Sequence, residues 1–131
     1  MGVAENKKLI RDVFDAWSGG DGNAFFNILA EDVKWTVIGS TPISRMYQSR
    51  KAFLEGAAQP LGEKINGAIR PTIHDIIAED DRIAVQWEGH ATGKNGTRYD
   101  QVYSWVMRIQ NGKVVEGTAY LDTDLIVRLW K

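Results

Sequence analysis

The stretch from Arg98 to Asp124 constrains the fold most, because it predicts two strands joined by a tight turn. Its first half alternates with a period of two, which is typical of a strand with two different faces. One face of that strand would carry Gln101, Tyr103, Trp105, Met107 and Ile109. Asn111-Gly112 tolerates positive φ at both central turn positions and therefore predicts a two-residue hairpin. The return strand, Val114 to Leu121, would end beside Asp122.

The bulk composition predicts one ordinary globular domain, residues 1–131, with 44% hydrophobic and 25% charged residues. A net charge of −1 argues against a nucleic-acid partner, since phosphate binding needs a basic patch. The sequence has no apolar run near the ~20 residues of a membrane span and no signal-peptide core. We therefore expect a cytoplasmic protein that does not act at a membrane. Because the chain has no cysteine, disulfides and thiolate metal sites are excluded.

The N-terminal half predicts three helices and one short strand. From Glu5 to Ser18, apolar residues recur on one face at helical spacing. A second short helix would carry the apolar residues of 24–29, and Val33–Val37 alternates as a strand. Ser49 is a suitable N-cap for a third helix from Arg50 to about residue 58. The segments 39–46 and 60–67 are predicted to be connections.

The C-terminal half predicts four strands in succession. Strands at Ile69–Ala78 and Arg82–Thr92 precede the two described above, and Asn95-Gly96 closes a second hairpin. Helices followed by an antiparallel meander are typical of the α+β class. We expect a curved, mostly antiparallel sheet wrapped around three N-terminal helices, with a conical pocket between them.

Several short motifs resemble one family of this fold. They are Trp17 before a Gly-Gly-Asp turn, the segment Leu29–Trp35, the pattern Gln101-x-Tyr103-x-Trp105-Val106-x-Arg108, the segment Asn111–Val114, and Tyr120-Leu121-Asp122-Thr123. On these residues the chain is similar to the SnoaL-like branch of the NTF2-like superfamily, which includes ketosteroid isomerases, limonene epoxide hydrolases and polyketide cyclases. The resemblance spans nearly the whole chain and implies the cystatin-like, NTF2-like fold with its conical pocket.

The resemblance favours some activities over others. The three catalytic positions of ketosteroid isomerases fall on Val13, Val37 and Trp105, which offer neither a base nor the donors that an enolate needs. The Arg-x-Asp pair of limonene epoxide hydrolases falls near Arg82, where its aspartate is missing. The single aspartate that serves SnoaL-type cyclases as general acid and base matches Asp122. The resemblance therefore implies cyclase-like chemistry at that residue.

Asp122 and Tyr103 are accordingly the expected catalytic residues, and Gln101 is expected to help hold a substrate oxygen. A carboxylate desolvated among aromatic rings can exchange protons near neutral pH, as acid–base catalysis requires. The alternative is that Asp122 is a structural residue, which either caps the strand end by accepting hydrogen bonds from the backbone amides of Thr123 or Asp124 or is paired with an arginine. Strand alternation places Asp122 on the face opposite Gly117, Ala119 and Leu121. If those residues face the cavity, Asp122 would reach it only through a bulge near the strand end.

The expected substrate-binding residues are mostly aromatic and apolar: Trp17, Trp35, Val37, Phe53, Gln101, Trp105 and Val13. For each apolar member the alternative is an ordinary core position. For Tyr103 and Gln101 the alternative is a buried, hydrogen-bonded polar group of the core.

We expect no metal and no organic cofactor. His74 and His90 have no second ligand at metal-binding spacing, so His74 is interpreted as structural and His90 as a surface residue beside Glu88. The chain has no glycine-rich phosphate loop. The outer sheet face would mix polar residues with apolar ones such as Val102 and Val106, and such a half-apolar face predicts a homodimer.

Three functions remain open from the sequence. The first is a cofactor-independent enzyme of isomerase, cyclase or dehydratase type, in which Asp122 acts on a small apolar molecule that contains a carbonyl. The second is a non-catalytic protein that binds a small apolar ligand in the same pocket. The third is an interaction module whose pocket is filled by its own side chains, without a cavity of about 300 Å³.

Overall fold

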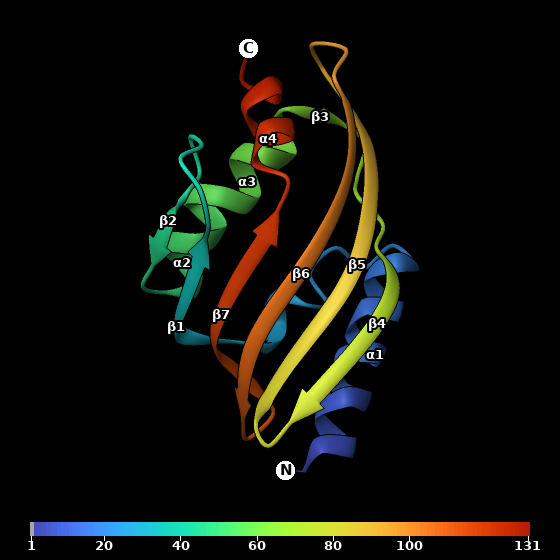
Figure 1. Ribbon diagram of the computed structural model, residues 1–131, viewed down its shortest axis with the longest axis vertical. Coiled ribbons are helices and arrows are strands. Elements are labelled where there is room, and N and C mark those ends of the chain that lie inside the picture. The colour runs from blue at the N-terminus through green and yellow to red at the C-terminus, as the bar shows by residue number, and fades with distance from the viewer. Residues whose placement is uncertain (1) are drawn as a thin grey trace.

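The computed structural model describes residues 2–131 as a curved sheet packed against helices (Figure 1). The seven strands are β1 Leu29–Val37, β2 Arg45–Tyr47, β3 Ile65–Asn66, β4 Thr72–Glu79, β5 Arg82–Gly93, β6 Arg98–Gln110 and β7 Lys113–Leu121. The helical elements are α1 Val3–Ser18, η1 Phe26–Ile28, α2 Arg50–Phe53, η2 Leu54–Ala58, α3 Gln59–Glu63 and α4 Thr123–Leu129. The sheet order is β2-β1-β7-β6-β5-β3, with β4 also paired to β5. The predicted α+β class with a curved, mostly antiparallel sheet is confirmed.

Strands β4 to β7 form the predicted antiparallel meander. Strands β5 and β6 pair without interruption from Arg82 opposite Arg108 to Thr92 opposite Arg98. Their partner β7 follows a turn in which Asn111 and Gly112 have φ angles of 53° and 75°. Both values are positive, as the two-residue hairpin requires, so this prediction is confirmed.

Strand β1 extends the sheet beyond the meander. It pairs in parallel with β7, and the pairing places Trp35 opposite Gly117. Parallel neighbours need a long crossover, and here the helical segment and the meander lie between the two strands. Segments 39–46 and 60–67 were predicted to be connections without regular structure. This prediction is wrong for the residues of the two segments that lie in β2 and β3. Those strands have three and two residues, too few for a periodic pattern to show.

The helices cover the inner face of the sheet. Helix α1 buries Ile10 and Phe14, the centre of the predicted apolar stripe. The third predicted helix begins as expected, since the Ala52 amide donates to Ser49 Oγ at 3.0 Å. It continues through η2 and α3 to Glu63 rather than ending near residue 58. The second predicted helix is only the 3-10 turn η1, because the chain enters β1 at Leu29.

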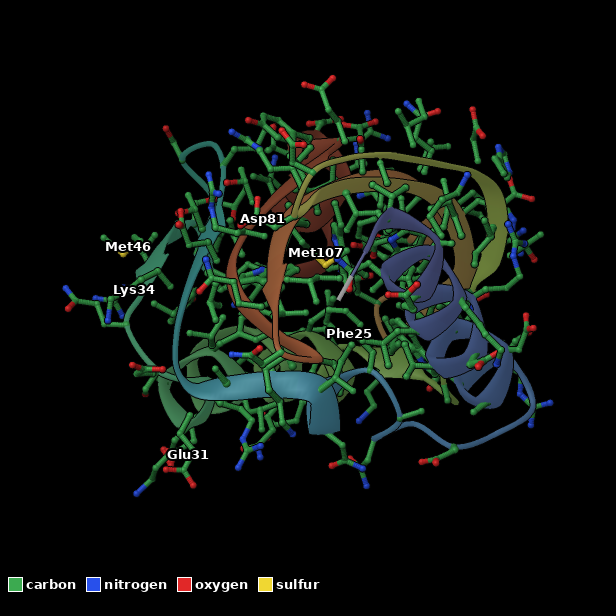
Figure 2. The ribbon with its side chains drawn as sticks, turned by 90° about the horizontal axis from the view of Figure 1, so that it is seen from below. Phe25, Glu31, Lys34, Met46, Asp81 and Met107 are labelled. Atoms are coloured by element: carbon green, nitrogen blue, oxygen red, sulfur yellow. The ribbon has the colours of Figure 1, made fainter. Side chains whose placement is uncertain are left out.

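Helix α4 was not predicted from the sequence. Asp122 is its N-cap, and the helix buries Ile126 and Leu129. An end-on view shows the sheet curling around an interior that contains Phe25 and Met107, while Lys34 and Met46 point outward (Figure 2). Met46 is 52% exposed, whereas Phe25 and Met107 are fully buried.

Gly117 shows how closely the inner face of the sheet is packed. A Cβ atom at this position would overlap the six-membered ring of the Trp35 indole. The ring of Trp35 in turn lies 5.0 Å from Trp105 in an edge-to-face arrangement. A glycine at 117 therefore lets the Trp35 ring pack directly against the backbone of β7.

Candidate functional site: an aromatic cavity

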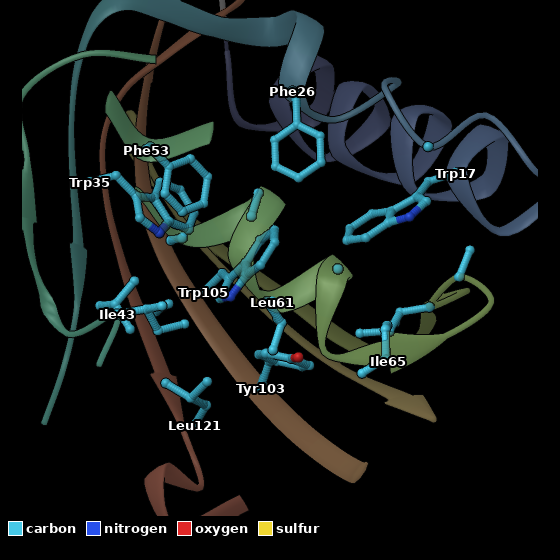
Figure 3. A pocket seen from close by; sticks show the side chains of 18 of the residues that line it. Trp17, Phe26, Trp35, Ile43, Phe53, Leu61, Ile65, Tyr103, Trp105 and Leu121 are labelled. Carbon is cyan, nitrogen blue, oxygen red and sulfur yellow. The ribbon is translucent and has the colours of Figure 1, made fainter. Parts of the chain in front are cut away.

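A cavity of about 290 Å³ lies between the helices and the inner face of the sheet (Figure 3). The sheet contributes Trp35, Val37, Trp87, Tyr103, Trp105, Ala119 and Leu121. The helices and the loops between elements contribute Trp17, Gly22, Phe26, Ile43, Phe53, Ala57, Ala58, Leu61, Gly62, Ile65, Gly67, Ala68 and Ile69. The volume lies at the lower end of small-molecule sites, about 300 Å³. The cavity is therefore about as large as the smallest ligand sites, and the core is not filled completely by its own side chains.

Six of the predicted site residues line this cavity: Trp17, Trp35, Val37, Phe53, Tyr103 and Trp105. Val13 does not line it; this side chain is half-buried and packs against the core. Gln101 is fully buried but lies behind the wall. Trp87 was missed as a lining residue, although it alternates inward with Ile83 and Val85 along β5.

The structure places Asp122 outside the cavity. Its side chain is exposed, and its Oδ1 accepts a hydrogen bond of 3.1 Å from the Asp124 amide at the start of α4. The only shift in the pairing of β6 with β7 lies between Arg108 and Ile109, far from Asp122. Without a bulge near the strand end, alternation turns Leu121 into the cavity and Asp122 away from it. The expectation that Asp122 faces the pocket is therefore wrong, and the capping alternative holds.

Tyr103 supplies the hydroxyl group of the cavity wall. Its ring stacks on Trp87 with a centroid distance of 3.9 Å and an angle of 9° between the planes. Its Oη lies 2.9 Å from the Oη of Tyr99, which is itself fully buried. Burial raises the pKa of Tyr103 well above its ordinary value. It also raises the pKa of Tyr99, so both phenols are protonated at neutral pH.

Gln101 supports this pair from behind. Its Nε2 donates to the backbone oxygen of Asp122 at 2.9 Å and to Tyr99 Oη at 3.4 Å. Its Oε1 accepts from the Asp122 amide at 2.8 Å and from the Val102 amide at 3.2 Å. This amide therefore ties the end of β7 to β6, and it contacts a tyrosine instead of a ligand.

The remaining polar groups of the wall are hydrogen-bond donors. The indole nitrogens of Trp35, Trp87 and Trp105 are buried and have no hydrogen-bond partner among residues 2–131. None of the lining residues, all of which the structure describes, carries a carboxylate, an imidazole, an ammonium or a guanidinium group. The chemistry of the wall is aromatic contact supplemented by a few donors.

A second polar cluster lies on the outer sheet face. His90 Nδ1 is 2.8 Å from Asp100 Oδ1, and Glu88 Oε2 lies 3.5 Å from His74 and 3.6 Å from His90. The hydrogen bond to Asp100 raises the pKa of His90. Both histidines are exposed. Within residues 2–131, no group of three or more histidine or acidic side chains is placed to hold a metal ion.

The helices of the same range include none long and apolar enough to cross a membrane.

The fold matches solved structures of NTF2-like proteins. Bal32a, from a soil-derived mobile gene cassette, is 22% identical with a TM-score of 0.80, and the match covers 98% of each chain. An NTF2-like protein from Burkholderia thailandensis is 20% identical with a TM-score of 0.79 and 95% of each chain covered. TerC, co-crystallised with polyporic acid, is 18% identical with a TM-score of 0.76, covering 95% of this chain and 96% of TerC. These likenesses define an NTF2-like fold.

The family is more specific than the fold. Residues 10–117 match the SnoaL-like domain, so the chain belongs to the SnoaL-like family. Comparison with curated protein sequences gives no match. The resemblance seen in the sequence motifs is thereby confirmed at the level of family and fold.

Proposed function

We propose that this protein binds a small, flat, mostly apolar molecule that carries at least one oxygen atom. The observation that carries the proposal is the aromatic cavity of about 290 Å³, with Tyr103 as its hydroxyl group. A dry apolar cavity of about 150 Å³ accommodates benzene. The present cavity is roughly twice that size, which suits a molecule of two fused rings.

The wall chemistry supports an apolar ligand with limited polarity. Aromatic side chains surround the space from several elements, including Trp17 on α1 and Phe53 on α2. Ring-on-ring contacts of this kind add about 0.5–1.5 kcal/mol each beyond area burial. A buried donor without a partner costs about 1–3 kcal/mol, so a ligand oxygen that reached one would gain from it.

A second candidate is a cofactor-independent isomerase, cyclase or dehydratase that uses the same cavity. Tyr103 favours it, because a phenol that stays protonated beside an apolar cavity can donate a proton or polarise a carbonyl. The general acid–base role expected of Asp122 would need its carboxylate to leave the N-cap of α4 and enter the cavity. Binding needs no such rearrangement and is therefore the function that we propose first.

The proposal also includes a homodimer formed through the outer sheet face. Val102 on β6 and Tyr120 on β7 are 59% and 47% exposed, and Ile77 on β4 is 57% exposed. Exposed apolar side chains on one face of the sheet fit a second copy of the same sheet. Size-exclusion chromatography with light scattering measures this directly.

The binding proposal is tested with two bicyclic probes, 1-tetralone and its parent hydrocarbon tetralin. Isothermal titration calorimetry gives affinity, and the five tryptophan indole signals in an NMR spectrum report where the probe sits. Four of the five tryptophans line the cavity and Trp130 does not, so Trp130 is an internal reference.

A matched pair of variants locates the binding. Ala57→Leu fills the cavity, because Ala57 is a buried lining residue. Ala52→Leu is the control, since Ala52 is exposed in the same helical segment. We expect binding by the wild type and by Ala52→Leu, and loss of binding by Ala57→Leu. No binding of either probe to the wild type, or equal binding by both variants, would overturn the proposal.

A further inference from the structure

We propose that Gln101 and Tyr99 fix the hydroxyl of Tyr103 as a hydrogen-bond donor toward the cavity, so that the site selects ligands with an acceptor oxygen, such as a ketone, a quinone or an ether. This inference rests on the proposed ligand binding and adds the chemical class of the ligand. Gln101 and Tyr99 act through Tyr103 and are positioning residues.

The first step is the orientation of the Gln101 amide, which the backbone determines. A backbone amide can only donate and a backbone carbonyl can only accept. The Asp122 amide at 2.8 Å therefore faces Oε1, and the Asp122 carbonyl at 2.9 Å faces Nε2. The Val102 amide also faces Oε1, at 3.2 Å. A flipped amide would oppose donors to donors at two of these contacts and acceptor to acceptor at the third.

The second step follows from the remaining proton on Gln101 Nε2. It is directed at Tyr99 Oη, at 3.4 Å. Tyr99 therefore accepts from Gln101, and its own proton needs another acceptor. Tyr99 is 0% exposed, so its hydroxyl has no contact with bulk water. Among residues 2–131 the other hydrogen-bond partner of Tyr99 Oη is Tyr103 Oη at 2.9 Å, so Tyr99 donates to Tyr103.

The third step is the proton of Tyr103. Its oxygen already accepts from Tyr99, and no further acceptor for its proton is found among residues 2–131. Tyr103 lines the cavity, and Figure 3 shows its oxygen among the lining side chains. The proton is therefore available to a ligand. Donation along a chain of hydrogen bonds polarises each member, which strengthens the last donor.

The polarity of the chain sets the ligand class. A ligand oxygen that faces Tyr103 has to accept, as a carbonyl does. The unpartnered indole N–H groups of Trp35, Trp87 and Trp105 are also donors, so the wall has the same polarity elsewhere. A hydrocarbon of the same shape would fill the cavity but leave the Tyr103 proton without a partner.

The experiment compares 1-tetralone with tetralin in the wild type, Tyr103→Phe and Tyr99→Phe. Each variant removes one hydroxyl oxygen and keeps the ring, which limits the disturbance to the core. We expect the wild type to prefer the ketone. Tyr103→Phe should weaken 1-tetralone binding about threefold to tenfold, the worth of one hydrogen bond, and leave tetralin within about twofold.

Tyr99→Phe tests the direction of the chain. If Tyr99 donates to Tyr103, its loss leaves the Tyr103 proton facing the cavity, and the ketone preference stays or falls slightly. If the chain ran the other way, the loss of Tyr99 would release the Tyr103 proton, and the ketone preference would rise. A rise would overturn the inference while leaving the binding proposal intact.

A measurement on the wild type alone makes the test independent of the variants. The carbonyl carbon of ¹³C-labelled 1-tetralone shifts downfield when its oxygen accepts a hydrogen bond. A downfield shift on binding, relative to the same probe in an apolar solvent, supports the inference. Binding of both probes with equal affinity and no such shift overturns it. Failure of both probes to bind overturns the proposed function itself and this inference with it.

Discussion

Replacing Asp122 separates a capping role from a catalytic one. In the structure its carboxylate makes one N-cap hydrogen bond of 3.1 Å, to Asp124, at the start of a seven-residue helix. Removing such a cap costs about 0.5–2 kcal/mol, typically near 1. Asparagine caps nearly as well as aspartate. We therefore expect Asp122→Ala to lower the free energy of unfolding by about 1 kcal/mol and Asp122→Asn to change it by less than about 0.3.

The expected change in melting temperature follows from chain length. An unfolding entropy of about 2.1 cal/mol/K per residue over 131 residues gives about 0.28 kcal/mol/K. A loss of 1 kcal/mol then lowers Tm by roughly 4 °C. Calorimetry or circular dichroism of the wild type and both variants measures the shift, and titration with 1-tetralone checks that binding is unchanged.

The decisive comparison is between the two variants. A cap predicts that alanine is harmful and asparagine is harmless, with ligand binding kept in both. A catalytic carboxylate predicts that both substitutions abolish turnover at unchanged stability. An unchanged Tm in Asp122→Ala would refute the capping interpretation. Loss of a measurable reaction in Asp122→Asn, with Tm and binding retained, would restore the enzyme hypothesis.

Three further outcomes follow from packing, charge and exposure. Gly117→Ala should lower the free energy of unfolding by about 1–3 kcal/mol in chemical denaturation, the usual cost of overpacking, because its Cβ would overlap Trp35. The hydrogen bond to Asp100 raises the pKa of His90. The pair therefore stabilises the fold below about pH 6.5, and this contribution is lost as the pH rises through the folded-state pKa of His90. Asp100→Asn should lower the pKa of His90 in an NMR titration. Val102→Lys on the outer face should convert the proposed homodimer to a monomer in light scattering, and an unchanged mass would contradict that interface.

Sequence patterns predicted the parts of this fold that repeat regularly. The alternation along β6 and the Asn111-Gly112 turn determined the strand, its inner face and its hairpin, because each depends on local backbone geometry. The same alternation separated Asp122 from Leu121 without deciding which of the two faces the cavity. The structure turns Leu121 inward and Asp122 outward, against the family-based expectation. Helix α4 was missed because its cap, Asp122, was interpreted as the end of a strand.

Four aliphatic side chains that line the cavity could not be predicted from a periodic pattern. Ile43, Leu61, Ile65 and Ile69 lie in short helices, two-residue pairings or loops. In such segments, apolar residues have no period from which a direction can be inferred. Their contact with the sheet arises from the path of the chain before and after α2, which depends on long-range packing. Apart from Trp87, the large aromatic residues of the strands were therefore predictable, as were Trp17 on α1 and Phe53 on α2, whereas these four aliphatic side chains were not.

Gln101 and Asp122 both have structural roles in place of the functional roles that their residue types suggest. The amide was expected to hold a ligand and the carboxylate to do chemistry, yet the amide holds the backbone of Asp122 through two short hydrogen bonds. Gln101→Ala would leave both backbone groups without these partners, and each lost bond costs about 1–3 kcal/mol. We expect a destabilisation of about 2–6 kcal/mol, clearly larger than for Asp122→Ala, measured by chemical denaturation. If Gln101→Ala cost no more than Asp122→Ala, the amide would not be what joins β6 to α4, and the orientation argued for the tyrosine pair would lose its basis.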